Sequence, residues 1–310
     1  MAGRRTFDVI VCGSLHLDIV VNAPNLPRLD ETVTGSHWGK VCGGKGGNQA
    51  VMSARLGAKT AMIGAVGDDD FGGQLLSNLQ AATVDCTAVA RDPTAGSGMS
   101  VAVMTASGDY GAVIVSGSNL NLVPADSVRK FHALGGASVL VLQNEIPEAV
   151  NLSVANAARA SGARVVLNAA PARTMGSEFL GVVDVLVVNI VEAEMMSGLS
   201  VTDAASAVRA LPALGSAQRD VVVTLGGKGL VFQAKGGKPA ILAPHSIRVV
   251  STHGAGDCFI GAVAKILADG GTLADACTFA NLAAARFVSL PLDERSKIAG
   301  HLEKSHASAH

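Results

Sequence analysis

The sequence contains few charged residues and very few aromatic ones. Of its 310 residues, 16% are charged and 3% are aromatic, with a single Trp and a single Tyr. An average soluble domain has about 25% charged residues. Lys and Arg total 24 and Asp and Glu total 25. Because this balance gives no electrostatic footprint for nucleic acid or an anionic membrane surface, neither is expected as a partner.

Long apolar runs and paired cysteines are also missing. No run approaches the roughly 18 apolar residues of a membrane helix. The five cysteines form no CxxC pair, and an odd number argues against a disulfide framework. Segment 1–13 does not have the pattern of a signal peptide. Since the hydrophobic share of 49% is too high for disorder, we expect a folded cytoplasmic protein with an aliphatic core.

Short aliphatic strands alternate with Ala-rich helical stretches along the chain. Strands rich in Val and Leu, without polar alternation, are typical of a parallel sheet covered by helices. The pattern predicts strands at 9–12, 60–64, 138–143, 164–167, 185–188 and 221–225. It predicts helices at 48–56, 71–81, 149–161 and 203–211, and a helical pair from Ala255.

Two segments have period-2 patterning instead. Met99, Val101 and Val103 alternate with polar or small neighbours, and so do Val113 and Val115. This alternation is typical of antiparallel strands with one solvated face. We therefore predict a small antiparallel β lid beside the main sheet, built from about residues 16–40 and 97–118.

A glycine-rich segment, Gly43–Ala50, reads GGKGGNQA. Glycines at the entry to a helix let backbone N–H groups approach a ligand closely, which suits an anion or a polyol. Lys45 and Asn48 add directed polar groups, which favours binding over a merely flexible turn. A Walker-type P-loop is excluded, because Gly46 stands where such a loop needs a Ser or Thr hydroxyl.

A second segment, Ser251–Asp257, reads STHGAGD and leads into an apolar stretch. The N–H groups of Ala255, Gly256 and Asp257 would be unpaired donors of a first helical turn. Such donors suit the negative charge that develops on a transferred phosphoryl group. Asp257 would accept a hydroxyl proton, and we expect the helix N-terminus to favour its ionised form. The alternative is that Asp257 only caps the helix.

Other polar residues follow predicted strands, where α/β sheets bind ligands. Glu192, just after strand 185–188, can hold Mg²⁺ through water or simply start a helix. Segment Thr224–Gly229 is either a glycine hairpin or a passage of backbone beneath a nucleotide. Asp18 and Glu145 can accept hydrogen bonds from sugar hydroxyls, or can be surface charges or caps.

In combination, these segments resemble the ribokinase-like (PfkB) family of carbohydrate and nucleoside kinases. GGKGGNQA looks like the family's N-terminal signature and STHGAGD like its C-terminal one. The resemblance extends from Val9 to about Val288. It implies a three-layer α/β/α fold with a mostly parallel sheet, as one domain over residues 1–310. It also implies a β lid that forms a homodimer.

The resemblance further implies ATP and Mg²⁺ as cofactors and a role for each matching residue. Asp257 would be the base on a primary hydroxyl of the sugar, with Gly254, Ala255 and Gly256 as the anion hole. The sugar would be bound by His16, Asp18, Gly44, Lys45, Asn48 and Glu145. The ATP site would be lined by Asn189, Thr224, Gly226, Gly229 and Asn281, and Glu192 would help organise Mg²⁺.

Three departures from the family pattern modify these expectations. His16 stands where the family's ribose kinases usually carry Asn, and an imidazole nitrogen cannot both donate and accept as an amide does. Ser251 replaces an aspartate that helps bind an activating monovalent cation. Segment Ser289–Asp293 replaces the family segment that would complete that cation site. The last two changes argue against activation by K⁺.

The sequence therefore predicts an ATP-dependent kinase acting on a primary hydroxyl of a sugar, with ribose as the leading substrate. One alternative is a nucleoside or other sugar kinase of the same family. The other is a non-catalytic descendant that binds a sugar or nucleotide. The chain lacks a GxGxxG after the first strand and a GxSxG elbow, which weakens dehydrogenase and hydrolase readings.

Overall fold

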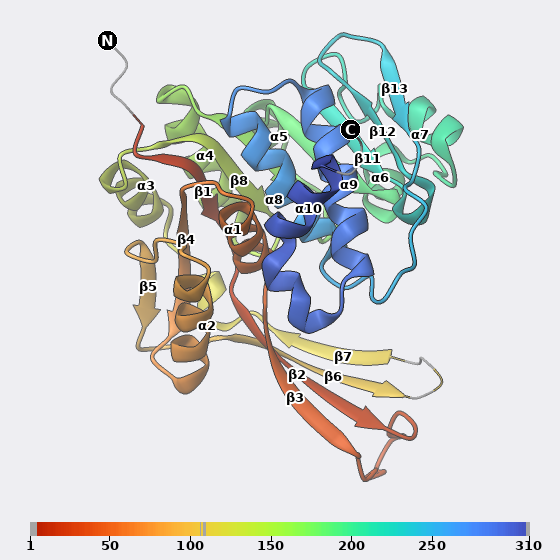
Figure 1. Ribbon diagram of the computed structural model, residues 1–310. Coiled ribbons are helices and arrows are strands. Elements are labelled where there is room, and N and C mark those ends of the chain that lie inside the picture. The colour runs from red at the N-terminus through yellow and green to blue at the C-terminus, as the bar shows by residue number, and fades with distance from the viewer. Residues whose placement is uncertain (1–4, 106, 108–109, 308–310) are drawn as a thin grey trace.

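The computed structural model describes residues 5–105, 107 and 110–307 (Figure 1). Within these residues, a nine-stranded sheet has the order β13-β12-β11-β10-β9-β8-β1-β4-β5. Its strands are β1 Phe7–Cys12, β4 Thr60–Gly67, β5 Val89–Asp92, β8 Ala137–Gln143, β9 Arg164–Asn168, β10 Val185–Asn189, β11 Asp220–Thr224, β12 Leu230–Gln233 and β13 Pro239–Leu242.

The strands from β5 to β11 pair in parallel, and the edge strands β12 and β13 are antiparallel. Parallel sheets are stable when both faces are covered, and all eight residues of β4 are buried. Along β1, Val9 and Val11 belong to one hydrophobic cluster, whereas Ile10 and Cys12 belong to the other. The aliphatic strands therefore serve two cores, one on each face.

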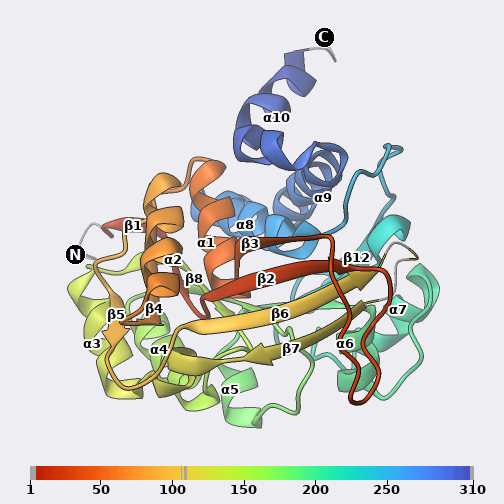
Figure 2. The same ribbon diagram turned by 90° about the horizontal axis from the view of Figure 1, so that it is seen from below.

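Helices cover both faces of the sheet, as Figure 2 shows from below. One layer contains α1 Lys45–Arg55, α2 Asp70–Ala81, α8 Ala255–Ala268, α9 Leu273–Ser289 and α10 Ile298–Ala307. The opposite layer contains α3 Pro124–Ala133, α4 Glu148–Ala160, α5 Ser177–Gly181, α6 Ile190–Ser197 and α7 Ala204–Ala210. Short 3₁₀ turns are η1 Gly117–Asn121, η2 Gly226–Lys228 and η3 Leu292–Lys297. The predicted three-layer α/β/α architecture is confirmed.

A second sheet of four strands projects below the main body, in the order β3-β2-β6-β7 (Figure 1). Its strands are β2 His16–Ala23, β3 His37–Gly43, β6 Gly98–Thr105 and β7 Tyr110–Val115. Both hairpins are antiparallel, as predicted, but their inner strands β2 and β6 run parallel. Residues 106 and 108–109 of the predicted lid lie outside the described residues.

Helix α1 begins inside the glycine run, at Lys45, and not at residue 48 as the sequence suggested. The reason is close packing against the turn after β1. A Cβ added at Gly46 would lie 2.6 Å from the Ser14 backbone nitrogen, a separation that side chains do not tolerate. Glycine therefore lets the first turn of α1 press onto the end of β1.

Helix α2 begins at Asp70, one residue before the start predicted from the sequence. Asp69 is the N-cap, and its carboxylate accepts a hydrogen bond from the Gly72 N–H at 2.7 Å. The same carboxylate accepts from the Ser97 N–H at 2.8 Å, just before lid strand β6. One aspartate thus caps a helix of the main body and holds the base of the lid.

No helix in the described ranges is both long and apolar enough to span a bilayer.

Candidate active site

Polar residues gather where the carboxyl ends of neighbouring parallel strands meet. Asn168, Asn189 and Thr224 are the last residues of β9, β10 and β11. Ser14 follows β1, and Glu145 follows β8. Open α/β sheets bind ligands at this edge, because connections that leave neighbouring strands toward opposite faces of the sheet leave a crevice between them.

A hollow of about 330 Å³ lies at this edge. Besides Asn168, it is lined by eight residues that the sequence singled out: Lys45, Asn189, Glu192, Thr224, Gly254, Ala255, Gly256 and Asp257. These residues come from α1, β9, β10, α6, β11, the loop before α8 and α8 itself. The fold therefore joins the two glycine-rich signatures, which lie about 200 residues apart in the sequence, in one cavity.

The Asp257 carboxylate is fixed by two side-chain amides of helix α1. Asn48 Nδ2 donates to Oδ2, and Gln49 Nε2 donates to Oδ1, each at 3.0 Å. Asp257 lies in the first turn of α8 but makes no capping hydrogen bond, so the alternative that it only caps the helix is wrong. Its side chain is held by α1, across the interface between the two helices.

The expectation that the helix N-terminus would favour the ionised form of Asp257 is also wrong. Burial raises the pKa of this carboxyl, while the charge of Lys45 and the hydrogen bonds from Gln49 and Asn48 oppose that rise. The desolvation outweighs these opposing effects. A raised pKa makes Asp257 a stronger proton acceptor than an exposed aspartate, which suits a general base.

Gln49 belongs to a buried chain of amides that the sequence did not reveal. Besides Asp257, its Nε2 contacts Asn168 Oδ1 at 3.1 Å, and its Oε1 accepts from Gln143 Nε2 at 2.8 Å. Asn151 Nδ2 in turn donates to the Gln143 carbonyl oxygen at 2.7 Å. Gln49, Gln143 and Asn151 are all fully buried. Because Gln143 and Asn168 hold the two ends of the Gln49 amide, the Nε2 group that donates to Asp257 has a fixed direction.

The loop before α8 presents backbone donors to the hollow. Gly254 is the N-cap with φ 78°, a left-handed conformation that favours glycine. The Ala255 N–H, which the sequence analysis counted as an unpaired donor, donates to the Thr252 carbonyl oxygen at 3.1 Å. Within the described chain, the N–H groups of Gly256 and Asp257 have no protein acceptor. These two donors are the ones oriented to receive an anion.

Glu145 connects residues that the sequence analysis assigned to the sugar site. Its Oε2 accepts hydrogen bonds from the Lys45 N–H at 2.9 Å and from the Ser14 hydroxyl, and it lies 3.9 Å from Nδ1 of His16. The carboxylate is therefore not a surface charge or a simple cap. It joins the end of β1, the start of lid strand β2 and the first residue of α1.

His16 and Asp18 both come from lid strand β2. His16 is buried, and its Nε2 has no hydrogen-bond partner in the described protein. A buried donor or acceptor without a partner is rare. Asp18 Oδ1 accepts from the Ser100 hydroxyl, and its Oδ2 packs against Gly43, beside Gly44. The lid therefore supplies polar atoms to the same region as Lys45 and Asn48.

Glu192 starts a helix and also lines the hollow. With Asn189 it forms a capping box: Asn189 N and Nδ2 donate to its two oxygens at 2.7 and 2.9 Å. Burial raises the pKa of Glu192. A carboxylate has about four acceptor sites, so sites remain for metal-bound water. In the described residues no group of three or more His, Cys, Asp or Glu side chains forms a metal cage. The site thus fits Mg²⁺ held largely by water and phosphate oxygens.

Three predicted nucleotide-site residues are not among those lining this hollow. Gly226 is the first residue of η2 and Gly229 directly follows η2, in the turn between β11 and β12, beyond Thr224. Gly229 has φ 88°, and a Cβ there would lie 2.1 Å from the Leu242 carbonyl oxygen. Asn281 Nδ2 donates to the Ala243 carbonyl oxygen at 2.9 Å. The hairpin reading of Thr224–Gly229 is confirmed, and the proposed ATP contacts at these positions stay predictions.

Comparison with known proteins gives a match over nearly the whole chain. The model for the pfkB family of carbohydrate kinases matches residues 6–294. This chain belongs to that family. It is 32% identical over 283 residues to a ribokinase of Haemophilus influenzae, with 91% of this chain and 92% of the other covered. It is 34% identical over 278 residues to a ribokinase of Bacillus subtilis, with 89% and 91% covered.

A solved structure of Arabidopsis thaliana ribokinase complexed with ribose and ATP is similar in fold. Its TM-score is 0.85 at 28% identity, and the match covers 95% of this chain and 98% of that one. A ribokinase structure from Thermotoga maritima gives a TM-score of 0.80 at 27% identity, with 95% and 99% covered. The pfkB architecture therefore extends through the lid as well as the main sheet.

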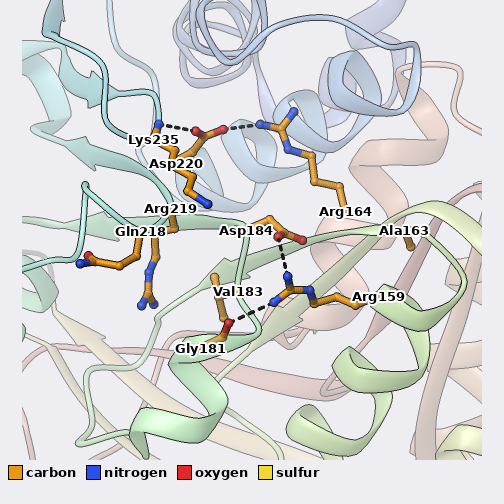
Figure 3. A pocket seen from close by; sticks show the side chains of 11 residues that line it. Arg159, Ala163, Arg164, Gly181, Val183, Asp184, Gln218, Arg219, Asp220 and Lys235 are labelled. Carbon is orange, nitrogen blue, oxygen red and sulfur yellow. Dashed lines mark hydrogen bonds and ion pairs between the residues drawn. The ribbon is translucent and has the colours of Figure 1, made fainter.

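A larger hollow of about 480 Å³ lies at the opposite edge of this pfkB kinase, at the amino ends of β9–β11 (Figure 3). Its two carboxylates already hold strand ends together. Asp220 pairs with Arg164 and accepts from the Lys235 N–H, and Asp184 lies 3.9 Å from Arg159 and accepts from the Val165 N–H. These two carboxylates therefore have a structural role, and the volume of a hollow does not by itself identify the active site.

Sequence reasoning missed two side chains of this kinase site. Gln49 lies inside the quoted GGKGGNQA segment, but nothing in the sequence indicates that its amide reaches Asp257. Asn168 ends β9 in the same way that Asn189 ends β10. The rule that ligands bind at carboxyl ends of strands would have identified Asn168. Gln49 required the tertiary structure.

Proposed function

We propose that this pfkB kinase transfers the γ-phosphoryl group of ATP to a primary hydroxyl of a sugar, with ribose as the substrate. The observation that carries the proposal is the position of Asp257. Its carboxylate lies in the hollow, fixed by Asn48 and Gln49, next to the N-terminus of α8. The ribokinases that match this chain over most of its length support ribose as the acceptor.

The sugar would bind between the lid and the start of α1. His16 and Asp18 on β2, and Glu145, Lys45 and Asn48 on the main body, provide donors and acceptors suited to adjacent hydroxyls. Asn48 would contact the sugar while also holding Asp257. A primary hydroxyl placed beside Asp257 would give its proton to that carboxylate as its oxygen attacks the γ-phosphorus.

Negative charge on the transferred group would be stabilised by fixed donors. Gly256 and Asp257 line the hollow in the first turn of α8, and within the described chain their N–H groups have no protein acceptor. The Lys45 side chain lines the same hollow and acts electrostatically on Asp257. Because phosphoryl transfer depends mainly on positioning and charge stabilisation, these groups would contribute most of the catalysis.

The nucleotide would extend from this anion site toward Asn189 and Thr224, with Gly226, Gly229 and Asn281 on the adjoining surface. Glu192 would hold a water of bound Mg²⁺, since its buried carboxylate lines the hollow. When bound with ATP, Mg²⁺ would neutralise phosphate charge.

The test is an Asp257→Asn variant. An amide cannot accept the proton, so we expect kcat to fall by about 100-fold or more, while the Kd for ATP measured by calorimetry stays close to that of the wild type. Turnover within a few-fold of wild type would show that Asp257 is not the base. ADP release without any acceptor sugar must be subtracted in both proteins.

A nucleoside or another sugar is the second candidate acceptor, because His16 leaves a buried Nε2 without a partner. That atom can bind a substrate group that ribose does not offer. A panel of pentoses, hexoses and nucleosides, assayed for ADP release, separates the candidates. A clear preference for ribose over every other sugar and every nucleoside would eliminate this second candidate. Release of ADP with any acceptor would eliminate a non-catalytic binding protein.

We also propose that the enzyme is a cytoplasmic homodimer formed through the lid. The side chains of Trp38, Val101, Val113 and Val115 lie on one face of the lid sheet and are 60%, 37%, 68% and 51% exposed. An apolar sheet face of this kind is usually covered. Since β2 of the lid also supplies His16 and Asp18, residues 1–310 would act as one functional domain.

A further inference from the structure

Arg295, in the 3₁₀ turn η3, lies beneath the loop that leads into α8. It is only 6% exposed. Nη2 donates to the Ser251 carbonyl oxygen at 2.6 Å, and Nη1 donates to the His253 carbonyl oxygen at 2.8 Å. Among the described residues, no carboxylate pairs with this guanidinium. A buried charge needs compensation, and here backbone carbonyls of the phosphate-facing loop supply it.

The same loop is held from a second side by the end of α9. The Val250 and Ser251 N–H groups both donate to the Val288 carbonyl oxygen, at 2.8 and 3.2 Å. The Phe287 ring lies against Gly254, and the Arg295 guanidinium packs over that ring, 4.4 Å from its centroid. Arg295 therefore fixes the loop both directly, through two carbonyls, and through Phe287.

We propose that Arg295 is a positioning residue for the anion-binding loop. Its guanidinium takes the place that a bound monovalent cation would otherwise have there. The guanidinium holds the Ser251 and His253 carbonyl groups in one orientation. This fixes the backbone conformation of the loop where it enters α8. Gly254 then takes its left-handed conformation, and Gly256 and Asp257 line the hollow. This inference builds on the kinase function proposed above.

The proposal implies that no mobile monovalent cation is needed at this loop. The two carbonyls that a cation would use are already occupied by guanidinium donors. A second positive ion at the same place would meet the charge of Arg295 and be repelled. Arginine is always charged in proteins, so the loop is held in one state whatever the ion content of the solution. This agrees with the expectation, from Ser251 and the altered segment 289–293, that K⁺ activation is lost.

The first experiment compares kcat of the wild type in K⁺, Na⁺ and tetramethylammonium buffers of equal ionic strength. We expect kcat to differ by less than about 2-fold among the three, within ordinary salt effects on exposed charges. Strong activation by K⁺ over Na⁺ would overturn the proposal. If the wild type turns over no sugar in any buffer, the proposed function fails, and the melting measurements below still test Arg295.

The second experiment uses Arg295→Met, which removes the charge and the donors while keeping much of the packing volume. Misplacement of the loop should lower kcat by about 100-fold, with a much smaller change in the sugar KM. Added guanidinium ion at millimolar concentration should restore part of kcat. Lys297→Met is the matched control. It removes a positive charge from the same turn, but Lys297 is exposed and pairs with Glu294, so kcat of this variant should not change.

Melting curves provide a readout independent of turnover. Guanidinium or K⁺ should raise the Tm of Arg295→Met relative to Na⁺, and should leave the wild type and Lys297→Met unaffected. If Arg295→Met does not fold, Arg295→Lys and Arg295→Gln are compared in buffer that contains neither K⁺ nor guanidinium. Arg295→Lys keeps the positive charge and ammonium donors, so it should retain more activity than Arg295→Gln. Full kcat in folded Arg295→Met, without any added cation, would show that Arg295 only packs.

Discussion

Replacing Gln49 by methionine tests whether the buried amide chain sets the proton affinity of Asp257. Methionine has similar length but cannot donate to Asp257 Oδ1, which Gln49 Nε2 contacts at 3.0 Å. A hydrogen bond to an ionised group is worth about 1.5–3 kcal/mol. Since one pKa unit corresponds to about 1.36 kcal/mol, loss of this bond should raise the Asp257 pKa by about one to two units.

The sign of the effect on activity follows from the role of Asp257 as a base. Only the ionised carboxylate accepts a proton, so activity falls as the pH drops through its pKa. Raising that pKa moves the acid limb of the kcat/KM profile to higher pH by the same one to two units, as an estimate. Burial already raises the wild-type pKa, so the variant should lose activity at mildly acidic pH first.

Stability should change in parallel but for another reason. Gln143 Nε2 and Asn168 Oδ1 lose their partner in Gln49→Met, and an unsatisfied buried polar group reduces the free energy of unfolding by about 1–3 kcal/mol. Urea denaturation measures this loss. Gln80→Met, at an exposed position of α2, is the control for both measurements. If the free energy of unfolding falls but the acid limb stays at its wild-type pH, Gln49 is only a packing residue.

Two further predictions concern Mg²⁺ and the lid. Glu192→Gln keeps one acceptor for the Asn189 N–H but loses the negative charge at the hollow. The Mg²⁺ concentration for half-maximal activity should therefore rise by about 10-fold or more. An unchanged Mg²⁺ titration would show that Glu192 does not help to bind the metal. Val113→Asp puts a charge on the exposed lid face and should convert a dimer to a monomer in light scattering, whereas Asp126→Asn on the surface of α3 should not. A wild type that is already monomeric would contradict the proposed lid interface.

The amino-acid sequence by itself determined the architecture and the two main segments of the site. Aliphatic runs such as Val139–Leu142 could only belong to strands buried on both faces, because they offer no polar side to water. The period-2 pattern around Val101 and Val113 similarly required a half-exposed sheet. Four glycines around Lys45, and the small residues before Asp257, required backbone to approach something closely. Strand burial, sheet exposure and close backbone approach each depend on a few neighbouring residues, so short sequence patterns reveal them.

Only the tertiary structure decided how these segments act on each other. The Asp257 pKa is raised because the fold buries the carboxyl, and its amide partner Gln49 lies 208 positions away in the sequence. The Ala255 N–H is already used by Thr252, which depends on the exact turn geometry. The sequence analysis did not single out Arg295, and its role became visible only because η3 packs beneath the phosphate-facing loop. Desolvation and hydrogen-bond partnership arise from contacts between distant segments, so no local pattern encodes them.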